Sequence, residues 1–475
     1  MPTSTRPPVR VLPPPEGERP PPRRKHRPNS RNLSTKAVFW LLAALLIAVP
    51  AVRLPGGGPM LALKGFVIEV VGIFLAAIII ARGEWSWRRT LAALTAAPNL
   101  AILAFLVWVA VSAARSELPQ FSRYEAMRYA GGSLIYFGVV YGLSLRRHLS
   151  QLLDVLLIAG AAGAIMAFLN YGETDTSRLA GAFRNEQLLA GFLCILFPIV
   201  LVASQKSSLP EDRDQLWRHL AAQAVAVMLA AGILVSQNRS AWMGTALALV
   251  AIAALFWRFG GDGRDKRVQK HQVVVPLVML VLAGGLFFYL SRTGSAVFSR
   301  VGTLAGVAQD GTYRWRRGMW DKAWRMTLKK PATGWGVGTF PVNQALYYHP
   351  DAPFRTQRTI VDRGPNLNDN AHNTYLQISA EMGFPGLALY LGIFAAFFVT
   401  ALRAAPKIRR GTRQAMLFAC VAAVLAQMVS AIGSPAWEFP EVSLFLWLVL
   451  GLGMAAAGVG ERGREAEEDS PTYEN

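Results

Sequence analysis

One histidine stands in a polar setting where it can act as a base. His372 lies in the segment Asp369-Asn370-Ala371-His372-Asn373-Thr374-Tyr375-Leu376-Gln377, directly before an apolar run. A neutral imidazole can take a proton from a hydroxyl at physiological pH, and the neighbouring amides and carboxylate can orient the ring. On composition alone, a lone histidine that caps a helix is more often structural. Its role therefore depends on what the fold brings beside it.

Arginines that can hold an anion occur in three other polar places. They are Arg239 in the short turn Ser236-Gln237-Asn238-Arg239-Ser240-Ala241-Trp242, Arg178 and Arg184 before another apolar run, and Arg314, Arg316 and Arg317 in a long polar stretch. A guanidinium binds phosphate oxygens in a bidentate fork, and an arginine near lipid is costly without a partner. A diphosphate would be such a partner, although snorkelling to lipid head groups is equally supported for Arg239.

The elements around these residues have the composition of a membrane protein. The chain has 475 residues, is 53% hydrophobic and carries a net charge of +20. Long apolar runs alternate with short basic loops. The positive charge is therefore expected to set the membrane topology and to meet anionic lipid, and it does not indicate a nucleic-acid partner. Cys194 and Cys420 both fall in apolar runs and are expected to be small core residues.

The apolar runs predict an all-α polytopic fold of about twelve membrane-spanning helices. The predicted spans are 37–53, 62–81, 98–114, 128–144, 151–170, 186–204, 219–236, 240–257, 272–291, 380–402, 412–432 and 440–459. The second span is unusual because it contains Lys64 and Glu69. Basic residues concentrate in alternate loops, which predicts that both termini are cytoplasmic and that the long polar stretch lies outside the membrane.

This topology divides the chain into five parts. They are a basic, Pro-rich cytoplasmic tail (1–35), helices one to nine (36–290), an outer-face loop domain (291–371), helices ten to twelve (372–460) and a second cytoplasmic tail (461–475). The same topology places the arginines and His372 on one face of the membrane.

Within the loop, 319–330 is predicted to form an amphipathic helix. Trp320, Trp324 and Leu328 recur at helical spacing, basic residues lie on the other side, and Pro331 ends the helix. Such a helix suits a membrane interface, and packing on its own loop domain is an equal alternative. Trp335 follows in a Gly-Trp-Gly-Val-Gly stretch, where it could stack on a sugar ring or anchor at the interface. No strand precedes these glycines, which argues against a dinucleotide site.

Four motifs in this order resemble the O-antigen ligase and O-antigen polymerase (WaaL/Wzy-like) family of membrane glycosyltransferases. They are Gly181-Ala182-Phe183-Arg184-Asn185-Glu186, the turn around Arg239, Arg316-x-x-x-Trp320 continuing to Gly334-Trp335-Gly336-Val337-Gly338, and His372 to Gln377 followed by Glu381-x-Gly383 and Gly386. The first motif is a partial match, since the family usually shows Phe-x-Asn-Pro-Asn there. The resemblance covers roughly 178–386.

The resemblance implies a GT-C-like enzyme that transfers a glycan from a polyprenyl-diphosphate carrier at the periplasmic face of the bacterial inner membrane. It implies that His372 is the base on the acceptor hydroxyl, that Arg239 and Arg316 hold the diphosphate, and that the reaction inverts without a metal or other cofactor. Expected substrate-binding residues complete the predicted site; they are Arg314, Arg184, Arg178, Tyr375, Gln377, Glu381 and Trp335. Arg314 remains an alternative to Arg316.

The acceptor is not fixed by these motifs. A ligase would deliver the glycan to lipid A core, a polymerase to the next lipid-linked repeat, and a protein O-oligosaccharyltransferase to protein hydroxyls. The size of the outer loop and the twelve predicted helices favour a ligase slightly. A flippase or transporter of lipid-linked saccharides is the alternative from another class of protein. It would need a polar path through the helix bundle, and the predicted spans contain few polar residues that could form one.

Overall fold

The computed structural model describes residues 30–52, 57–81, 93–169, 183, 185–204, 213–260, 311–347, 370–409, 411–435 and 439–461. Within these ranges all regular structure is helical. The elements are α1 (Ser30–Ala51), α2 (Gly57–Ala81), α4 (Ala97–Ala114), α5 (Pro119–Phe137), the π-helical turn η1 (Gly138–Gly142), α6 (Leu145–Leu169), α7 (Glu186–Ser204), α8 (Arg213–Val235), α9 (Arg239–Phe259), α12 (Gly311–Lys329), α13 (Phe340–Asn343), the 3-10 turn η5 (Gln344–Tyr347), α15 (Thr374–Ala404), α16 (Thr412–Ser430) and α17 (Pro440–Ala456).

The chain is a polytopic membrane protein. Nine of the described helices are long and apolar enough to cross a membrane, and α17 is a shorter apolar helix. The predicted span 128–144 corresponds to the second half of α5 and η1, a stretch that does not meet the same criterion of length and hydropathy. The predicted span 272–291 lies outside the described residues.

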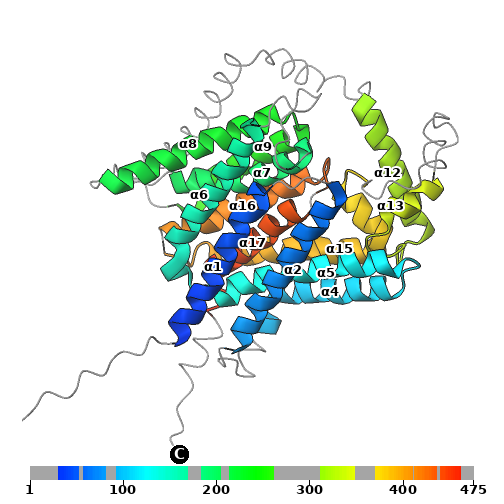
Figure 1. Cartoon of the computed structure of the whole chain (residues 1–475), viewed down its shortest axis with the longest axis horizontal. Coiled ribbons are helices and arrows are strands. Elements are labelled where there is room, and N and C mark those ends of the chain that lie inside the picture. The colour runs from blue at the N-terminus through cyan, green and yellow to red at the C-terminus, as the bar shows by residue number, and fades with distance from the viewer. Residues whose placement is uncertain are drawn as a thin grey trace, which may run out of the picture.

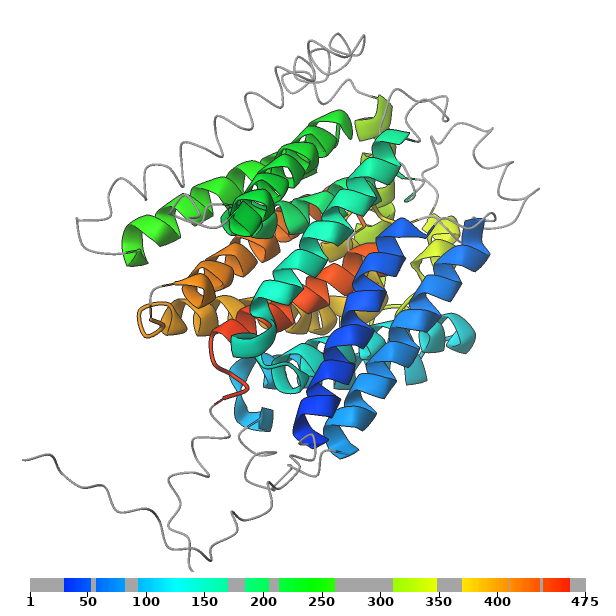
Figure 2. The ribbon, with the colours of Figure 1, turned by 60° about the vertical axis from the view of Figure 1, so that its left-hand side comes forward.

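The helices divide into a buried centre and an outer layer. Almost all side chains of α7 and α17 are buried, and 67% of the apolar window of α16 is buried beside them. Outer helices instead expose large apolar side chains such as Ile73, Ile80 and Val107, which suits contact with lipid tails. The outer pair α1 and α2 (dark blue) lie side by side across the bundle (Figures 1 and 2).

Charged residues in the predicted second span are accommodated by neighbouring helices. The Lys64 ammonium of α2 lies 2.9 Å from a carboxylate oxygen of Glu441 in the first turn of α17, and both side chains are buried. Glu69 packs against Gly131 of α5, where an added Cβ would lie 2.8 Å from its Cγ atom. Pairing between helices makes a buried charge tolerable, so α2 is a genuine helix despite its charges.

Helix α15 is kinked near its start. Gly383 has φ 70° and ψ −178°, a conformation that only glycine adopts readily, and Pro385 follows it. The amide of Phe384 donates to the carbonyl of Pro331 across 2.8 Å, so the loop after α12 fills the gap in the helix. The kink therefore joins the predicted outer loop to the membrane helix that begins beside His372.

Helix α12 starts earlier than predicted, at Gly311. Met319, Ala323 and Met326 form a small core with Phe340, Ala371 and Ala380, whereas Trp324 and Leu328 of the predicted tryptophan stripe are exposed. The smaller apolar side chains thus make the close contact with α15. Figure 1 shows α12 (yellow-green) at the side of the bundle where α15 begins.

Candidate functional site

His372 is held in a strained backbone conformation at the entrance to α15. Its φ is 48°, and its amide donates to Oδ1 of Asn370 across 2.9 Å. The next residue, Asn373, caps α15 by accepting from the amides of Tyr375 and Leu376. Non-glycine residues with positive φ are costly and gather at functional sites. The side chains of Asn370 and Asn373 therefore fix the backbone from which the imidazole ring extends.

On one side, the imidazole forms a hydrogen bond with a side chain of α7. Its Nδ1 lies 2.9 Å from Oε1 of Gln187, a buried residue in the first turn of that helix. A carbonyl oxygen only accepts, so Nδ1 carries the hydrogen and Nε2 keeps its lone pair when the ring is neutral. This is the tautomer in which Nε2 can take a proton from a substrate hydroxyl.

The other contacts of the histidine come from α12. The ring of Trp315 meets the imidazole edge-on, with ring centroids 4.8 Å apart. Burial and, to a smaller extent, the positive charge of Arg316 together lower the pKa of His372 from 6.5 to about 4. The ring is therefore neutral at pH 7, as a general base must be before it accepts a proton.

The turn before α9 approaches the same place. Asn238 caps α9, its Oδ1 accepting from the amide of Ala241 at 3.2 Å and from the Ser240 hydroxyl at 2.7 Å. Gln237 in this turn has φ 53°. Within the described residues, Gln237 and His372 are the two non-glycine residues with positive φ. The strained backbone thus occurs in the two motifs that carry the candidate arginine and histidine.

Gly433, after α16, shows how closely the arginine motifs converge. A Cβ added there would lie 3.0 Å from Ser240, the neighbour of Arg239, and 3.6 Å from a guanidinium nitrogen of Arg316. The segment after α16 also contacts the start of α15, where the amide of Thr374 donates to the carbonyl of Ala431 across 3.0 Å. The starts of α7, α9 and α15, the end of α16 and helix α12 thus meet at one end of the bundle, here called the histidine end.

Tight packing of α9 on α16 sets the position of Arg239 at the start of α9. A Cβ on Gly244 would lie 2.3 Å from the carbonyl oxygen of Ala426, so only glycine permits this approach. Gly244 lies in the second turn of α9, and Arg239 is the first residue of that helix. The Nε atoms of Arg239 and Arg316 are both buried, which places both guanidinium groups against the protein rather than in open solvent.

Arg314 differs from Arg316 although both lie on α12. Arg314 is exposed, whereas Arg316 is partly buried and lies close enough to lower the pKa of His372. Two residues span about 200° of a helix, so their side chains leave opposite sides. The other two predicted arginines, Arg178 and Arg184, lie outside the described residues.

Glu381 and Gln377 connect the histidine segment to the glycine-rich loop. The buried Glu381 carboxylate accepts from the amides of Gly338 at 2.8 Å and Phe340 at 3.1 Å. The Gln377 amide nitrogen donates to Glu381 across 3.3 Å, and its oxygen accepts from the amide of Ala371 at 2.9 Å. The two side chains therefore form a continuous set of hydrogen bonds that ends at the residue before His372.

Tyr375 and Trp335 also make their polar contacts within the protein. The Tyr375 hydroxyl donates to the carbonyl of Met428 across 2.7 Å, which ties α15 to α16. The Trp335 indole donates to the carbonyl of Met326 across 3.0 Å, and the Lys330 ammonium lies 4.0 Å from its ring centroid. These contacts fix the surroundings of the site, and direct substrate binding by these residues stays a prediction.

Two residues of the site were missed in the sequence. Gln187 was not singled out because a glutamine in the first turn of an apolar helix looks like a cap. Its signal was its place directly after Arg184-Asn185-Glu186, the motif that already pointed to this face. Trp315 stands between Arg314 and Arg316 in the sequence, and its contact with His372 depends on how α12 lies against α15.

The fold and site define a polytopic membrane protein that gathers a neutral histidine and two arginines at one end of its helix bundle. Residues 224–391 match the family model of O-antigen ligase, which confirms the family resemblance of the motifs. His372, Arg239 and Arg316 all lie within the matched residues, and Gln187 lies outside them. No match is found among curated proteins. The O-antigen ligase domain supports a glycosyltransferase of the ligase or polymerase type.

Proposed function

We propose that this protein is an O-antigen ligase-like glycosyltransferase that moves a glycan from a polyprenyl-diphosphate carrier to a hydroxyl of lipid A core. The observation that carries the proposal is the convergence of His372, Arg316 and the Arg239 turn at the histidine end. A base and two cations are what transfer from a diphosphate requires, and the O-antigen ligase match over 224–391 supports the same reaction class.

The reaction can be written with these residues in named roles. The acceptor hydroxyl attacks the anomeric carbon, so a new C–O bond forms while the bond from that carbon to the diphosphate oxygen breaks. The Nε2 atom of His372 takes the hydroxyl proton, and Gln187 holds the Nδ1–H tautomer that leaves Nε2 free to do so. Attack from the side opposite the leaving group inverts the anomeric configuration.

Arg239 and Arg316 bind the diphosphate as negative charge develops on it. A guanidinium provides fixed donors and a permanent charge, which stabilises the leaving group in a site shielded from water. The bound diphosphate also opposes the positive charge of Arg316, which adds to burial in lowering the pKa of His372. Donor binding therefore makes the histidine a stronger base in the complex than in the free protein.

The proposal includes the finer topology. In this proposal the chain crosses the inner membrane twelve times, with both termini in the cytoplasm and the histidine end in the periplasm. Eleven of the twelve predicted spans overlap described helices, and 272–291 is the twelfth. The exposed Trp324 and Leu328 of α12 suit a position at the membrane surface, where a lipid-linked donor presents its diphosphate.

The decisive experiment incubates purified protein with lipid-linked repeat units, with and without lipid A core. A ligase transfers the glycan only when lipid A core is present, and the product carries lipid A at its reducing end. Longer chains that remain on the polyprenyl carrier would instead show a polymerase. Movement of the labelled lipid across sealed vesicles without any new glycosidic bond would refute glycosyl transfer.

A further inference from the structure

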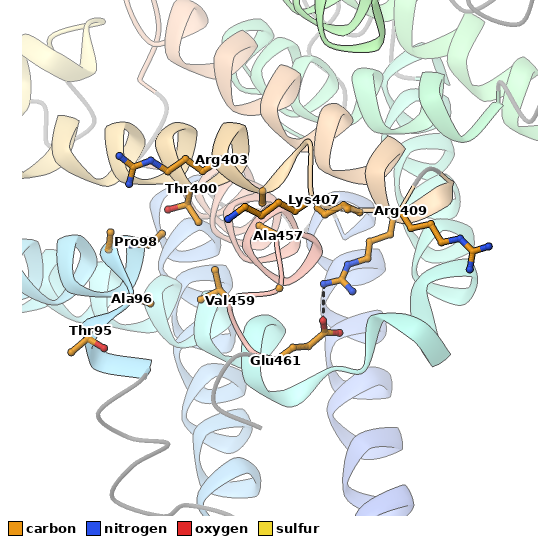
Figure 3. Close-up of a pocket in the computed structure, with 15 residues that line it drawn as sticks. Thr95, Ala96, Pro98, Thr400, Arg403, Lys407, Arg409, Ala457, Val459 and Glu461 are labelled. Carbon is orange, nitrogen blue, oxygen red and sulfur yellow. Dashed lines mark hydrogen bonds and ion pairs between the residues drawn. The ribbon is translucent and has the colours of Figure 1, made fainter. Parts of the chain in front are cut away.

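A cavity lies at the end of the bundle opposite the histidine end. Its volume is about 780 Å³, which is within the range of small-molecule sites. Four segments that are distant in sequence form it: the start of α4, the end of α15 with the loop that follows, the start of α16 and the residues after α17 (Figure 3). None of the motifs at the histidine end contributes to it.

The cavity is strongly basic. Four cationic side chains line it, with a single carboxylate; they are Arg403, Lys407, Arg409, Arg413 and Glu461. The one carboxylate is already engaged, because Arg413 donates to Glu461 across 2.8 Å and to the carbonyl of Ala456 across 2.8 Å. Within the described part of the chain, Arg403, Lys407 and Arg409 form no ion pair.

These cations are distributed around the mouth and the wall of the cavity. The Lys407 side chain extends toward Thr400, while Arg403 and Arg409 lie at opposite rims and point away from each other (Figure 3). Arg413 is fixed at the far wall by its bonds to the end of α17. Several cationic side chains around an open volume attract the head group of an anionic lipid.

The rest of the lining is apolar. Ala96 and Pro98 at the start of α4, Ile408 in the loop after α15 and Val459 after α17 form this part of the wall. These residues lie at the ends of membrane-spanning helices, where lipid head groups meet acyl chains. Cations beside an apolar wall at the ends of these helices suit a ligand that has a charged head group and a hydrocarbon chain.

We propose that this cavity binds the phosphate head group of an anionic phospholipid in the leaflet at this end of the bundle. The positive-inside rule assigns this end to the cytoplasm, where loops rich in lysine and arginine meet anionic lipid. The lipid would bridge α4, α15 and α17, and of these α15 begins at the histidine end. The proposal does not depend on glycosyl transfer.

Native mass spectrometry of the full-length protein tests the site, with phosphatidylglycerol or phosphatidylcholine added in detergent. We expect phosphatidylglycerol to bind in preference, and Arg403→Gln with Lys407→Gln to weaken its binding about tenfold or more. Arg258→Gln is the matched control, because Arg258 is an exposed cation in the last turn of α9 outside the cavity. Equal binding of both lipids, or an equal loss in the control, would refute a selective site.

Two further arms separate the lipid from other anions. Inorganic phosphate should not displace phosphatidylglycerol, and full displacement at matched concentration would mean that the site recognises free phosphate. The chain's own acidic residues Glu465, Glu467, Glu468 and Asp469 are a second source of negative charge. If lipid binding appears only after these four are neutralised in the full-length protein, the tail occupies the cavity and the lipid proposal is wrong.

Discussion

The Nδ1 atom of His372 and the Oε1 atom of Gln187 lie 2.9 Å apart, although 185 residues separate them in the chain. This bond joins the loop before α15 to the first turn of α7. It holds the neutral tautomer whose Nε2 is available to a substrate. The pKa of about 4 keeps the ring in that neutral form throughout the physiological pH range.

His372→Ala is expected to lower the rate of glycan transfer by at least about a hundredfold, because the reaction loses its base. His219→Ala is the matched control, since His219 lies on α8 and bonds to Gln223 on the same helix. Transfer to lipid A core measures activity, and size-exclusion chromatography checks folding. Full activity of a well-folded His372→Ala protein would remove His372 from the mechanism.

Replacement of Gln187 tests its role in positioning. In Gln187→Glu, a carboxylate beside the imidazole stabilises the protonated ring, so the pKa of His372 should rise by about 1 to 3 units. The acid limb of the kcat/KM profile should then move to higher pH. Gln187→Leu should lower kcat more than it changes KM, because the ring loses its orientation.

The control for Gln187 is Gln223→Glu, which places the same charge beside His219, 2.9 Å from the altered side chain. It should leave the pH profile of transfer unchanged. An unmoved acid limb in Gln187→Glu would show that the bond to His372 is not made in the working enzyme.

Arg316→Gln should raise the pKa of His372, because a positive charge that opposes protonation is removed. The pKa stays below 6.5, since burial is the larger cause and remains. Histidine NMR measures the titration directly, independent of the expected loss of activity. Arg314→Gln is the control on the same helix; an equal rise there would assign the electrostatic effect to the helix as a whole rather than to Arg316.

The pH dependence of the unaltered enzyme follows from the same pKa. His372 is already deprotonated at pH 6, so its kcat/KM profile should be flat between pH 6 and 8 and should fall only as pH approaches 4. Rates of lipid-linked glycan transfer across this range provide the test. A half-maximal point near 6.5 would indicate a solvent-exposed histidine and contradict the buried site.

Gly383→Ala should destabilise the protein by about 3 kcal/mol or more, because φ 70° is unfavourable for alanine and its Cβ would lie 2.6 Å from the carbonyl oxygen of Pro331. Thermal unfolding in detergent measures the change. Gly392→Ala in the same helix is the control, since no atom lies within 4 Å of its Cβ. That substitution should be neutral or stabilising by up to about 1 kcal/mol.

The sequence predicted the helical class and most of the spans, because a bilayer demands long apolar segments whatever their partners are. It singled out His372, Arg239 and Arg316 as candidates by residue type and motif, and the match at 224–391 agrees with the family that these motifs resemble. Lys64 and Glu69 made α2 hard to predict, because the Lys64 partner, Glu441, is 377 residues away.

Tertiary structure alone decided how the site is assembled. Helical periodicity could not choose between Arg314 and Arg316, since only the packing of α12 on α15 turns one toward His372 and leaves the other exposed. Gln187 and Trp315 became part of the site through contacts between distant segments. Residue type fixes which chemistry a side chain can perform, whereas burial and long-range packing fix its charge state, its tautomer and its neighbours.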